Sequence, residues 1–472
     1  MAIQTQHVDL LVLGGGLSGL STAMHACEMA GGNDFSVLVI EKTEALGGSS
    51  QYSSGMFWAP KDKSMAHETI QYGEHGLIDK LIDGHRSAVD WFRTQGLRVS
   101  DEFPGIMSIG LGYPIDIKAL TQLAIDKIRA RSTAKILLNT SAISLLQDYR
   151  SGPVRGAIIL PDGGEPIEVH AKTTVISMGG FQGSPKLVSR YIGPGADNIF
   201  VRSNRGNTGD GLSLASKAGA GSSRGMSTFY GHLLPSPLQA SEVDPFQFLH
   251  IAQFQSSRTV LVNRRGKRFC DETMGDEVSN QAVAQQENRI AYMILSDEAR
   301  EKYATGEPWP NAGFVDRIQK AKDVGGRVFK VKTVEGLVQG LATWGVAATN
   351  LKNTIQGYNT AARLLESGSK VDPSNLDAPI GTNEYGKPPH GPITDDNGPF
   401  WALEVQPSIT LTYGGTKINS SSQALTQNGR AIENLYVTGV DAGGFSNYRY
   451  CAGLALAWVT GKWAGEAAVG GR

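Results

Sequence analysis

The sequence predicts an α/β protein in which a parallel-sheet domain is interrupted by an inserted α+β domain. Three observations lead to this prediction. Residues 8–13, which are mostly apolar, run into a glycine-rich turn, and an Ala- and Met-rich helical pattern follows. A second apolar run, residues 35–40, comes next and ends on an acidic residue. Residues 435–438 supply another core strand near the far end of the chain, so the polar stretch between them is an insertion.

The first glycine-rich turn, GGGLSG, has the glycine spacing of a dinucleotide-binding turn. Gly14 permits the tight turn, Gly16 lets a pyrophosphate approach the backbone, and Gly19 lets the helix pack closely on the strand. The N–H groups at the helix start then face the phosphates. Glu41, at the end of the second strand, can accept both hydroxyls of an adenosine ribose. The sequence therefore predicts a Rossmann-type, dinucleotide-binding domain, whereas an ordinary β-turn-α unit leaves Glu41 unexplained.

The bulk composition narrows the classes of function. With 472 residues and a net charge of −1, the chain has room for roughly two or three domains and no charge bias toward nucleic acid or an anionic membrane. The three cysteines, Cys27, Cys270 and Cys451, are far apart and form no disulfide framework or metal motif, which favours the cytoplasm and no metal. The first strand begins within about eight residues and no apolar run reaches about 18 residues, so we expect no signal peptide and no membrane span.

The region after Glu41 is predicted to be a long loop followed by two helices. Residues 42–60 are rich in Gly and Ser with aromatic residues interleaved, which predicts a loop laid along a flat cofactor; a plain glycine-rich connector is the alternative. Amphipathic helices are predicted over residues 77–96 and 116–131. A loop that contains Tyr113 is expected between them.

Short strands are predicted next, and two further glycine-rich turns accompany them. The strands cover residues 135–138, 141–147, 154–160, 166–170 and 173–177. The last strand leads into a glycine pair that we expect to lie against the phosphates of the cofactor. Residues 204–221 then open a helix on a polar turn, where Thr208 or Asp210 is expected to cap the first turn.

The middle of the chain is interpreted as a second domain inserted into the first. It contains a hairpin-like pair of runs, residues 258–263 and 266–269, and several polar helices. The C-terminal part returns to the first domain with a last strand and a closing helix over residues 452–468. The expected domains are 1–235 and 380–472 for the nucleotide-binding domain and 236–379 for a capping domain.

Several segments of the chain match, in order, the motifs of a known flavoprotein superfamily. They are GGGLSGL with Glu41, LGGSSQYSSGMFWAP, VISMGGF, NTGDGLSLASKAGA, VNRRGKRFCDE, PFWALEV, TYGGTKI and NLYVTG. In this pattern the chain resembles the FAD-dependent fumarate reductase and succinate dehydrogenase flavoproteins, and most of all their ketosteroid dehydrogenase and tricarballylate dehydrogenase branch. The resemblance covers nearly the whole chain. It implies a glutathione-reductase-like FAD-binding domain, a cap over the flavin, and addition or removal of two hydrogens across a C–C bond beside a carbonyl or carboxylate.

The chain also departs from the fumarate reductase pattern. Counting on from the RFCDE segment, Asp276 stands where those enzymes place an arginine acid, and the family's histidine is missing from residues 408–413. The loop SSQYSS has no histidine of the kind at which some relatives tether the flavin, so the resemblance implies FAD bound without a covalent link. The acidic residue after the last strand, Asp441, is displaced by one position from the family's ribityl-contacting residue.

The resemblance places substrate-binding groups just before the last helix. Arg449 sits near the carboxylate-binding arginine of the reductases and would bind a carboxylate or keto oxygen. Tyr450 and the amide of Gly453, at a helix start, could polarise a carbonyl where enolate charge develops. A tyrosine that merely packs and an arginine that is only a surface charge are the alternatives.

A further side chain must carry the proton. Tyr113 and Tyr413 are candidates, although a lone tyrosine is more often part of a core. His232, in the segment FYGHLLP, is a second acid/base candidate. Arg268 and Glu272 are expected to form a structural pair rather than a catalytic one.

The expected cofactor contacts lie in the glycine-rich turns and beside them. They are Gly14, Gly16, Leu17, Ser18, Gly19, Glu41, Lys42, Gly47, Gly48, Ser49, Ser50, Ser54, Gly55, Met56, Ala142, Gly179, Gly180, Asn207, Thr208, Asp210, Gly439, Asp441, Gly453, Leu454 and Ala455. We expect a small-molecule substrate and an unidentified electron acceptor or donor as partners. Two other functions stay open: an oxygen-using flavin oxidase or hydroxylase, and an electron-transfer FAD subunit that works only with a partner protein.

Overall fold

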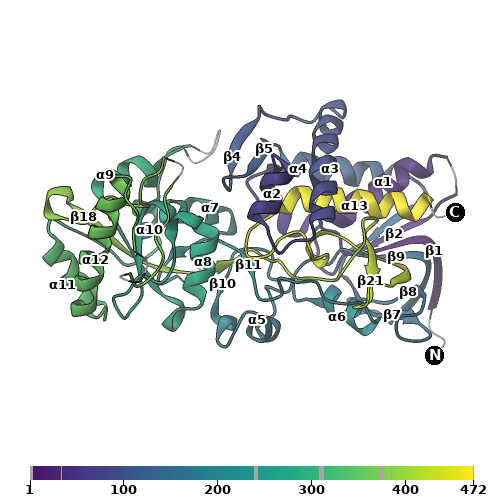
Figure 1. The fold of residues 1–472 in the computed structure, drawn as a ribbon. Coiled ribbons are helices and arrows are strands. Elements are labelled where there is room, and N and C mark those ends of the chain that lie inside the picture. The colour runs from purple at the N-terminus through teal and green to yellow at the C-terminus, as the bar shows by residue number, and fades with distance from the viewer. Residues whose placement is uncertain are drawn as a thin grey trace. The chain divides into compact units, whose positions relative to one another are not determined.

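The computed structural model describes residues 4–32, 34–238, 243–307, 313–372, 374, 376–383 and 385–470. The chain forms two compact units. Unit 1 comprises Met1–Asp197, Ser203–Phe229 and Leu411–Arg472, and unit 2 comprises Asn198–Arg202 and Tyr230–Thr410. The chain therefore leaves unit 1, builds unit 2 and returns to unit 1 for its last strand and helix (Figure 1). The domain limits predicted at residues 236 and 379 stay a prediction, because a compact unit is not by itself a functional domain.

Unit 1 is built on a sheet that has eight strands in the described part of the chain. Its main path is β21 (Gln423–Leu425), β22 (Ala431–Val437), β9 (Ile167–Ile176), β1 (Gln4–Leu13), β2 (Val37–Ile40) and β6 (Ala134–Leu137), while β8 (Val154–Pro161) pairs with β9 and β7 (Thr140–Gln147) with β8. The strands from β22 to β6 along this path are mutually parallel. All of β2 is buried, which explains its uniformly apolar sequence VLVI. The predicted α/β fold is confirmed.

Helices from both ends of the chain pack together in unit 1. They are α1 (Leu17–Ala30), α3 (His75–Thr94), α4 (Ile117–Arg129) and α13 (Gly453–Gly470). The C-terminal α13 lies alongside the N-terminal α1 (Figure 1). Glycine permits this approach, because a Cβ added at Gly461 would lie 2.4 Å from the carbonyl oxygen of Ser18 and one at Gly465 would lie 2.6 Å from that of Thr22. The helices α1 and α13, from opposite ends of the chain, therefore belong to one layer of unit 1.

Two segments expected to be loops form a small antiparallel sheet instead. Its strands are β3 (Met56–Pro60), β5 (Gly110–Pro114) and β4 (Phe103–Ile106), in that order. Two glycines of β5 make room for neighbouring side chains: a Cβ added at Gly110 would lie 2.4 Å from the indole of Trp58, and one at Gly112 would lie 2.4 Å from Cδ1 of Ile106. The runs 166–170 and 173–177 also join into the single strand β9.

Unit 2 is built on a second sheet with helices on both faces. The sheet order is β12 (Leu234–Pro235), β18 (Phe400–Gln406), β14 (Ala291–Ser296) and β13 (Val260–Val262), and β17 (Val328–Val331) also pairs with β18. One face packs on α11 (Val334–Thr343) and α12 (Ala348–Glu366), and the other packs on α10 (Arg317–Asp323). The predicted hairpin-like pair within residues 258–269 is present as a short turn, in which Val262 and Arg268 form an isolated antiparallel bridge and the backbone N–H of Asn263 donates to the carbonyl of Lys267 at 2.9 Å. The extended strand partner of β13 is β14.

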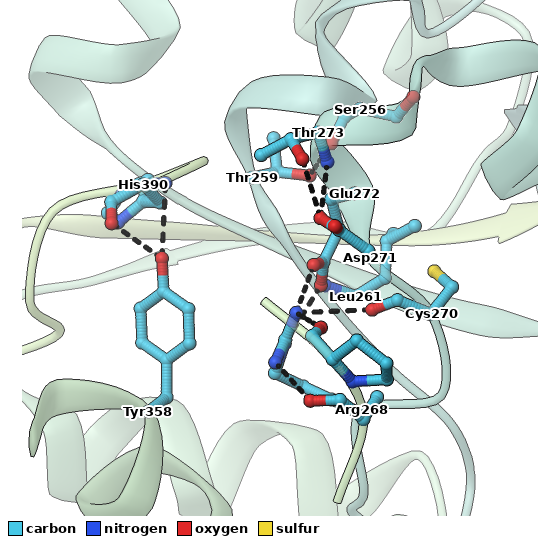
Figure 2. Close-up of polar contacts among 12 residues, drawn as sticks. Ser256, Thr259, Leu261, Arg268, Cys270, Asp271, Glu272, Thr273, Tyr358 and His390 are labelled. Carbon is cyan, nitrogen blue, oxygen red and sulfur yellow. Dashed lines mark hydrogen bonds and ion pairs between the residues drawn. The ribbon is translucent and has the colours of Figure 1, made fainter. Parts of the chain in front are cut away.

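A buried ion pair cross-links the interior of unit 2 (Figure 2). The guanidinium of Arg268 donates to both carboxylate oxygens of Glu272, with Nε 3.1 Å from Oε1, and to the carbonyl of Cys270 at 3.1 Å. The same Oε1 accepts the backbone N–H of Leu261 at 2.9 Å. The ring of Tyr358 lies 5.4 Å from the guanidinium. The predicted pair is therefore present, and its charges are satisfied inside the protein.

None of the described helices combines the length and the apolar character that crossing a membrane requires.

Candidate functional site

The glycine turn between β1 and α1 uses its glycines in different ways. Gly14 has φ +110°, and an added Cβ would lie 2.3 Å from the carbonyl oxygen of Ser177, which directly follows β9. A Cβ at Gly19 would lie 2.0 Å from the Gly14 oxygen, so this glycine permits close packing of helix and strand. At Gly16 nothing lies within 4 Å of an added Cβ. The open side of Gly16 is where a ligand can approach the backbone.

Glu41 directly follows β2 and its carboxylate is buried and fixed. Oε2 accepts the backbone N–H of Gly15 at 2.9 Å, and Oε1 accepts the backbone N–H and hydroxyl of Thr43 at 2.9 and 2.8 Å. A carboxylate offers about four acceptor positions. The side chain is therefore held in place and keeps acceptor capacity for the hydroxyls of a ribose.

These groups surround a cavity whose walls belong to unit 1. The predicted residues that line it are Gly14, Gly16, Leu17, Ser18, Glu41, Lys42, Gly47, Gly48, Ser49, Ser50, Gly179, Asn207 and Gly439. The lining residues that sequence reasoning missed are Ile40, Thr140, Ser177, Met178, Asn204, Val440 and Ala457. Ile40, Met178 and Val440 each adjoin a predicted residue in the chain. Ala457 lies one helical turn beyond Gly453, so helical spacing was the available signal for it.

The other predicted cofactor residues do not line this cavity. They are Gly19, Ser54, Gly55, Met56, Ala142, Gly180, Thr208, Asp210, Asp441, Gly453, Leu454 and Ala455. Two of them, Thr208 and Asp210, contact Lys42, which does line the cavity. Lys42 Nζ donates to Asp210 Oδ2 at 2.7 Å and to Thr208 Oγ1 at 3.0 Å. The predicted helix cap is wrong, because α6 (Asp210–Lys217) begins after Gly209 at φ +80° with no side-chain cap. Thr208 and Asp210 instead hold the Lys42 amine at the wall.

Asp441 ties two glycine turns together from behind the cavity. Its Oδ2 accepts the backbone N–H of Gly179 at 2.6 Å, and a Cβ added at Gly211 would lie 2.1 Å from its Oδ1. Burial raises the pKa of Asp441 to about 8, although the N–H of Gly179 opposes the shift. Val440, and not Asp441, lines the cavity. The acidic residue stands one position later than in the family pattern. Its carboxyl therefore points into the protein interior and not into the cavity.

The cavity has the groups that an FAD requires. Gly16 is the N-cap of α1, whose first turn has no acidic residue, so free N–H groups and the positive end of the helix dipole face a diphosphate. Lys42 adds a cation, and Glu41 adds the ribose acceptor. The residues from Gly16 to Ser18 would hold the pyrophosphate. When bound, FAD supplies a two-electron acceptor or donor.

The structure brings three of the predicted catalytic residues together at the start of α13. The backbone N–H of Gly453 donates to Tyr450 Oη at 2.7 Å. The Tyr450 ring stacks on Tyr413, with centroids 6.2 Å apart, and meets Trp58 edge-on at 5.5 Å. Trp58 was not predicted as a site residue, although it is one of the aromatics interleaved in the Gly/Ser-rich segment. The cluster is an aromatic wall that carries the Tyr450 and Tyr413 hydroxyls and the Gly453 amide.

Arg449 and Tyr113 have different surroundings. Arg449 is half-buried and next to Tyr450 in the chain, and its backbone N–H donates to the carbonyl of Asn447 at 2.7 Å. Tyr113 lies on β5, where its hydroxyl donates to Glu102 Oε2 at 3.4 Å. Burial and the Glu102 carboxylate raise the pKa of Tyr113. The Tyr113 hydroxyl is therefore hydrogen-bonded to the neighbouring carboxylate of Glu102.

His232 belongs to unit 2 and is buried there with two polar partners. Its Nε2 lies 2.8 Å from Tyr230 Oη, and its Nδ1 bonds the carboxylate of Asp276. Tyr230 was missed by sequence reasoning. The available signal was its spacing, because residues two apart in an extended segment share a face.

The cavity, its ribose acceptor and its phosphate-facing helix start define an FAD-binding flavoprotein of the α/β class. The chain belongs to the FAD binding domain family, whose profile matches residues 9–456. This confirms the predicted superfamily and cofactor, and the chain is an FAD-dependent oxidoreductase.

Curated relatives are similar over most of this chain. The vinyl phenol reductase of Lactiplantibacillus plantarum is 24% identical over 477 residues, covering 94% of this chain and 91% of that protein. The NADH:fumarate oxidoreductase of Klebsiella pneumoniae is 25% identical over 471 residues, covering 95% of this chain. The chain spans about half of that protein's length, 46%.

A solved structure shares the fold. The 3-ketosteroid Δ1-dehydrogenase of Sterolibacterium denitrificans, in complex with 1,4-androstadiene-3,17-dione, superposes with a TM-score of 0.72 at 18% identity, and the alignment covers 99% of this chain and all of that one.

Proposed function

We propose that the protein desaturates or reduces a carbon–carbon bond next to a carbonyl or carboxylate of a small molecule. The substrate loses or gains one hydrogen as a proton and the other as a hydride exchanged with N5 of the flavin. In this proposal Tyr450 and the Gly453 amide hold the oxygen on which enolate charge develops, and Arg449 binds a carboxylate or keto oxygen. Residues 236–379 are proposed to be the capping domain.

One observation carries the proposal: the 2.7 Å hydrogen bond between Gly453 N and Tyr450 Oη at the start of α13. The Gly453 amide, at the positive end of α13, donates to the phenol oxygen, and this bond polarises the Tyr450 hydroxyl toward an oxygen that becomes an anion in the transition state. The relatives act on compatible chemistry by name, since fumarate, vinyl phenol and a Δ1-unsaturated ketosteroid each contain a conjugated carbon–carbon double bond.

The test is anaerobic mixing of the FAD-loaded protein with a substrate panel. The chemically reduced protein is mixed with cyclohex-2-enone, fumarate, 4-vinylphenol and a 3-ketosteroid-1,4-diene, and the oxidised protein with their saturated counterparts. The proposal expects the flavin absorbance to return in the first case or to bleach in the second with at least one compound. No change with any compound would refute it.

The same experiment separates the two alternatives. Bleaching in air accompanied by stoichiometric peroxide or a hydroxylated product would favour an oxygen-using oxidase or hydroxylase. Bleaching that requires an added redox protein would favour an electron-transfer subunit.

We further propose that FAD is held without a covalent bond, because the segment SSQYSS has no histidine. Acid precipitation should therefore release all of the flavin into the supernatant. We also propose a cytoplasmic location, a separate electron acceptor or donor and no nucleic-acid partner, in keeping with the near-neutral net charge of −1.

A further inference from the structure

Tyr230, His232 and Asp276 form one hydrogen-bonded series within unit 2. The Tyr230 hydroxyl lies 2.8 Å from His232 Nε2, and His232 Nδ1 bonds the carboxylate of Asp276. His232 is 3% exposed and Asp276 is 9% exposed, whereas Tyr230 is half-buried. The accessible end of the series is therefore the phenol, and its other end is a buried carboxylate.

The surrounding structure fixes the imidazole between its two partners. The backbone of His232 is held by Ser408, whose Oγ donates to its carbonyl at 2.5 Å. Ser408 is held in turn by the side chain of Asn280, on α8 (Asp276–Ala284), through two hydrogen bonds of 3.0 Å. The ring of Phe254 packs edge-on against the imidazole at 4.6 Å. Because α8 also carries Asp276 at its first position, one helix sets both the ring and its carboxylate.

The carboxylate decides which imidazole nitrogen carries the proton. An ionised carboxylate only accepts hydrogen bonds, so Nδ1 of His232 carries the hydrogen that Asp276 receives. Asp276 lies at the first position of α8, at the positive end of the helix dipole. Nε2 is then an acceptor, and the Tyr230 hydroxyl donates to it. The Tyr230 hydroxyl is therefore hydrogen-bonded to a ring nitrogen that can accept its proton.

Burial and two nearby guanidinium groups disfavour the protonated form of His232. Burial lowers the pKa of His232, the Asp276 carboxylate opposes this shift, and the guanidinium groups of Arg202 and Arg317 add to it. Both arginines are themselves buried, at 5% and 4% exposure. The imidazole therefore favours its proton-accepting form, and the Asp276 carboxylate stabilises the imidazolium that forms when it takes a proton.

We propose that Tyr230 is the catalytic residue that exchanges the substrate's proton, and that His232 and Asp276 are positioning residues that relay it. The proposal rests on the proposed function. It gives Asp276 a role in the slot where fumarate reductases have an arginine acid: a carboxylate there cannot donate as an arginine does, but it orients the imidazole.

The proton and electron balance is complete. In desaturation the Cα–H bond breaks and its proton joins Tyr230 Oη, while the Tyr230 proton joins Nε2 of His232. The hydrogen on the adjacent carbon leaves with its electron pair to FAD, the oxidant of the proposed function, and the C=C bond forms. In reduction every transfer reverses, so desaturation consumes neutral His232 and reduction consumes the imidazolium. The rate of desaturation should therefore rise, and that of reduction fall, as the pH passes upward through the pKa of the relay.

The test uses the FAD-loaded protein and the panel compound that the wild type turns over fastest. Tyr230→Phe should slow the flavin absorbance change by about 10²–10⁴-fold, the usual contribution of a general acid or base. Tyr385→Phe is the matched control, because Tyr385 is a tyrosine of the same unit with 71% exposure, and it should leave the rate unchanged. Asp276→Asn should lower the rate and abolish the pH dependence assigned to the relay, and Asp276→Glu should restore part of both. FAD content and the thermal melting profile confirm that each variant is folded.

Each outcome decides between the proposals. If the wild type turns over no panel compound, the proposed function fails and the relay with it. If the wild type is active and Tyr230→Phe matches Tyr385→Phe, the relay is refuted while the proposed function stands. If Tyr230→Phe is slow but Asp276→Asn keeps the wild-type pH profile, the phenol only packs against substrate and the relay is again refuted. A slow Tyr230→Phe together with a changed pH profile in Asp276→Asn supports it.

Discussion

Gly14 and Gly16 lie in one turn, yet the same substitution should affect them differently. Gly14→Ala forces an L-residue to φ +110° and places its Cβ 2.3 Å from the carbonyl oxygen of Ser177. The positive φ alone costs about 1–2 kcal/mol, and a backbone clash adds to that cost because neither strand end can move independently. Gly16 has φ −72° and open space at the Cβ position. We expect Gly16→Ala to change the free energy of unfolding of the FAD-free protein by less than about 1 kcal/mol, the usual scale of N-cap changes.

The Gly16 substitution should instead weaken FAD binding. Its added methyl projects from a residue that lines the cavity, at the helix start that faces the phosphates. Losing one hydrogen bond to a charged group costs about 1.5–3 kcal/mol. That loss corresponds to a rise of roughly 10- to 150-fold in the Kd for FAD.

Two measurements check this pair of variants. Urea unfolding of the FAD-free proteins gives the stabilities, and quenching of flavin fluorescence during titration gives the Kd. Gly31→Ala is the matched control, because Gly31 follows α1 at φ +57° with nothing within 4 Å of an added Cβ, so it should lose stability and bind FAD normally. The reasoning is refuted if folded Gly16→Ala binds FAD as the wild type does, or if it unfolds as readily as Gly14→Ala.

Three further predictions concern stability, pH and turnover. Glu272→Gln leaves Arg268 buried without its counter-charge and should cost about 3–5 kcal/mol in urea unfolding, whereas removing the exposed carboxylate of Glu335 in the same way should leave the midpoint nearly unchanged. Burial raises the pKa of Asp441 from 3.8 to about 8, so its contribution to stability is present below the unfolded value and is lost as the pH rises through the folded value. The FAD-free wild type should therefore lose up to about 1.4 kcal/mol per pH unit more than Asp441→Asn across this window, and equal slopes in urea unfolding would contradict the shift. Tyr450→Phe should slow the flavin absorbance change with the best panel compound by about 10²–10³-fold at unchanged FAD affinity; a wild-type rate would remove Tyr450 from the oxygen site.

The sequence by itself determined the parts of this protein that depend on neighbouring residues. The strand-turn-helix at Gly14 to Gly19, the acidic residue at the end of β2 and the amphipathic helices α3 and α4 all follow from spacing within one or two turns of chain. Local backbone geometry and periodic burial act over these distances, so the pattern of residue types suffices. The α/β fold and the FAD family follow from these segments and their order.

The tertiary structure alone decided which distant side chains meet. Lys42 is held by a residue 168 positions away, and His232 bonds one 44 positions away. The loop expected around Tyr113 forms strands β4 and β5 instead, because β5 pairs with β3, which lies about fifty residues earlier in the chain. The packing of Asp441 against the turns at Gly179 and Gly211 decides that its carboxyl faces the protein interior and not the cavity. Such contacts are selected by the packing and desolvation of the whole unit, and no local pattern of residue types encodes them.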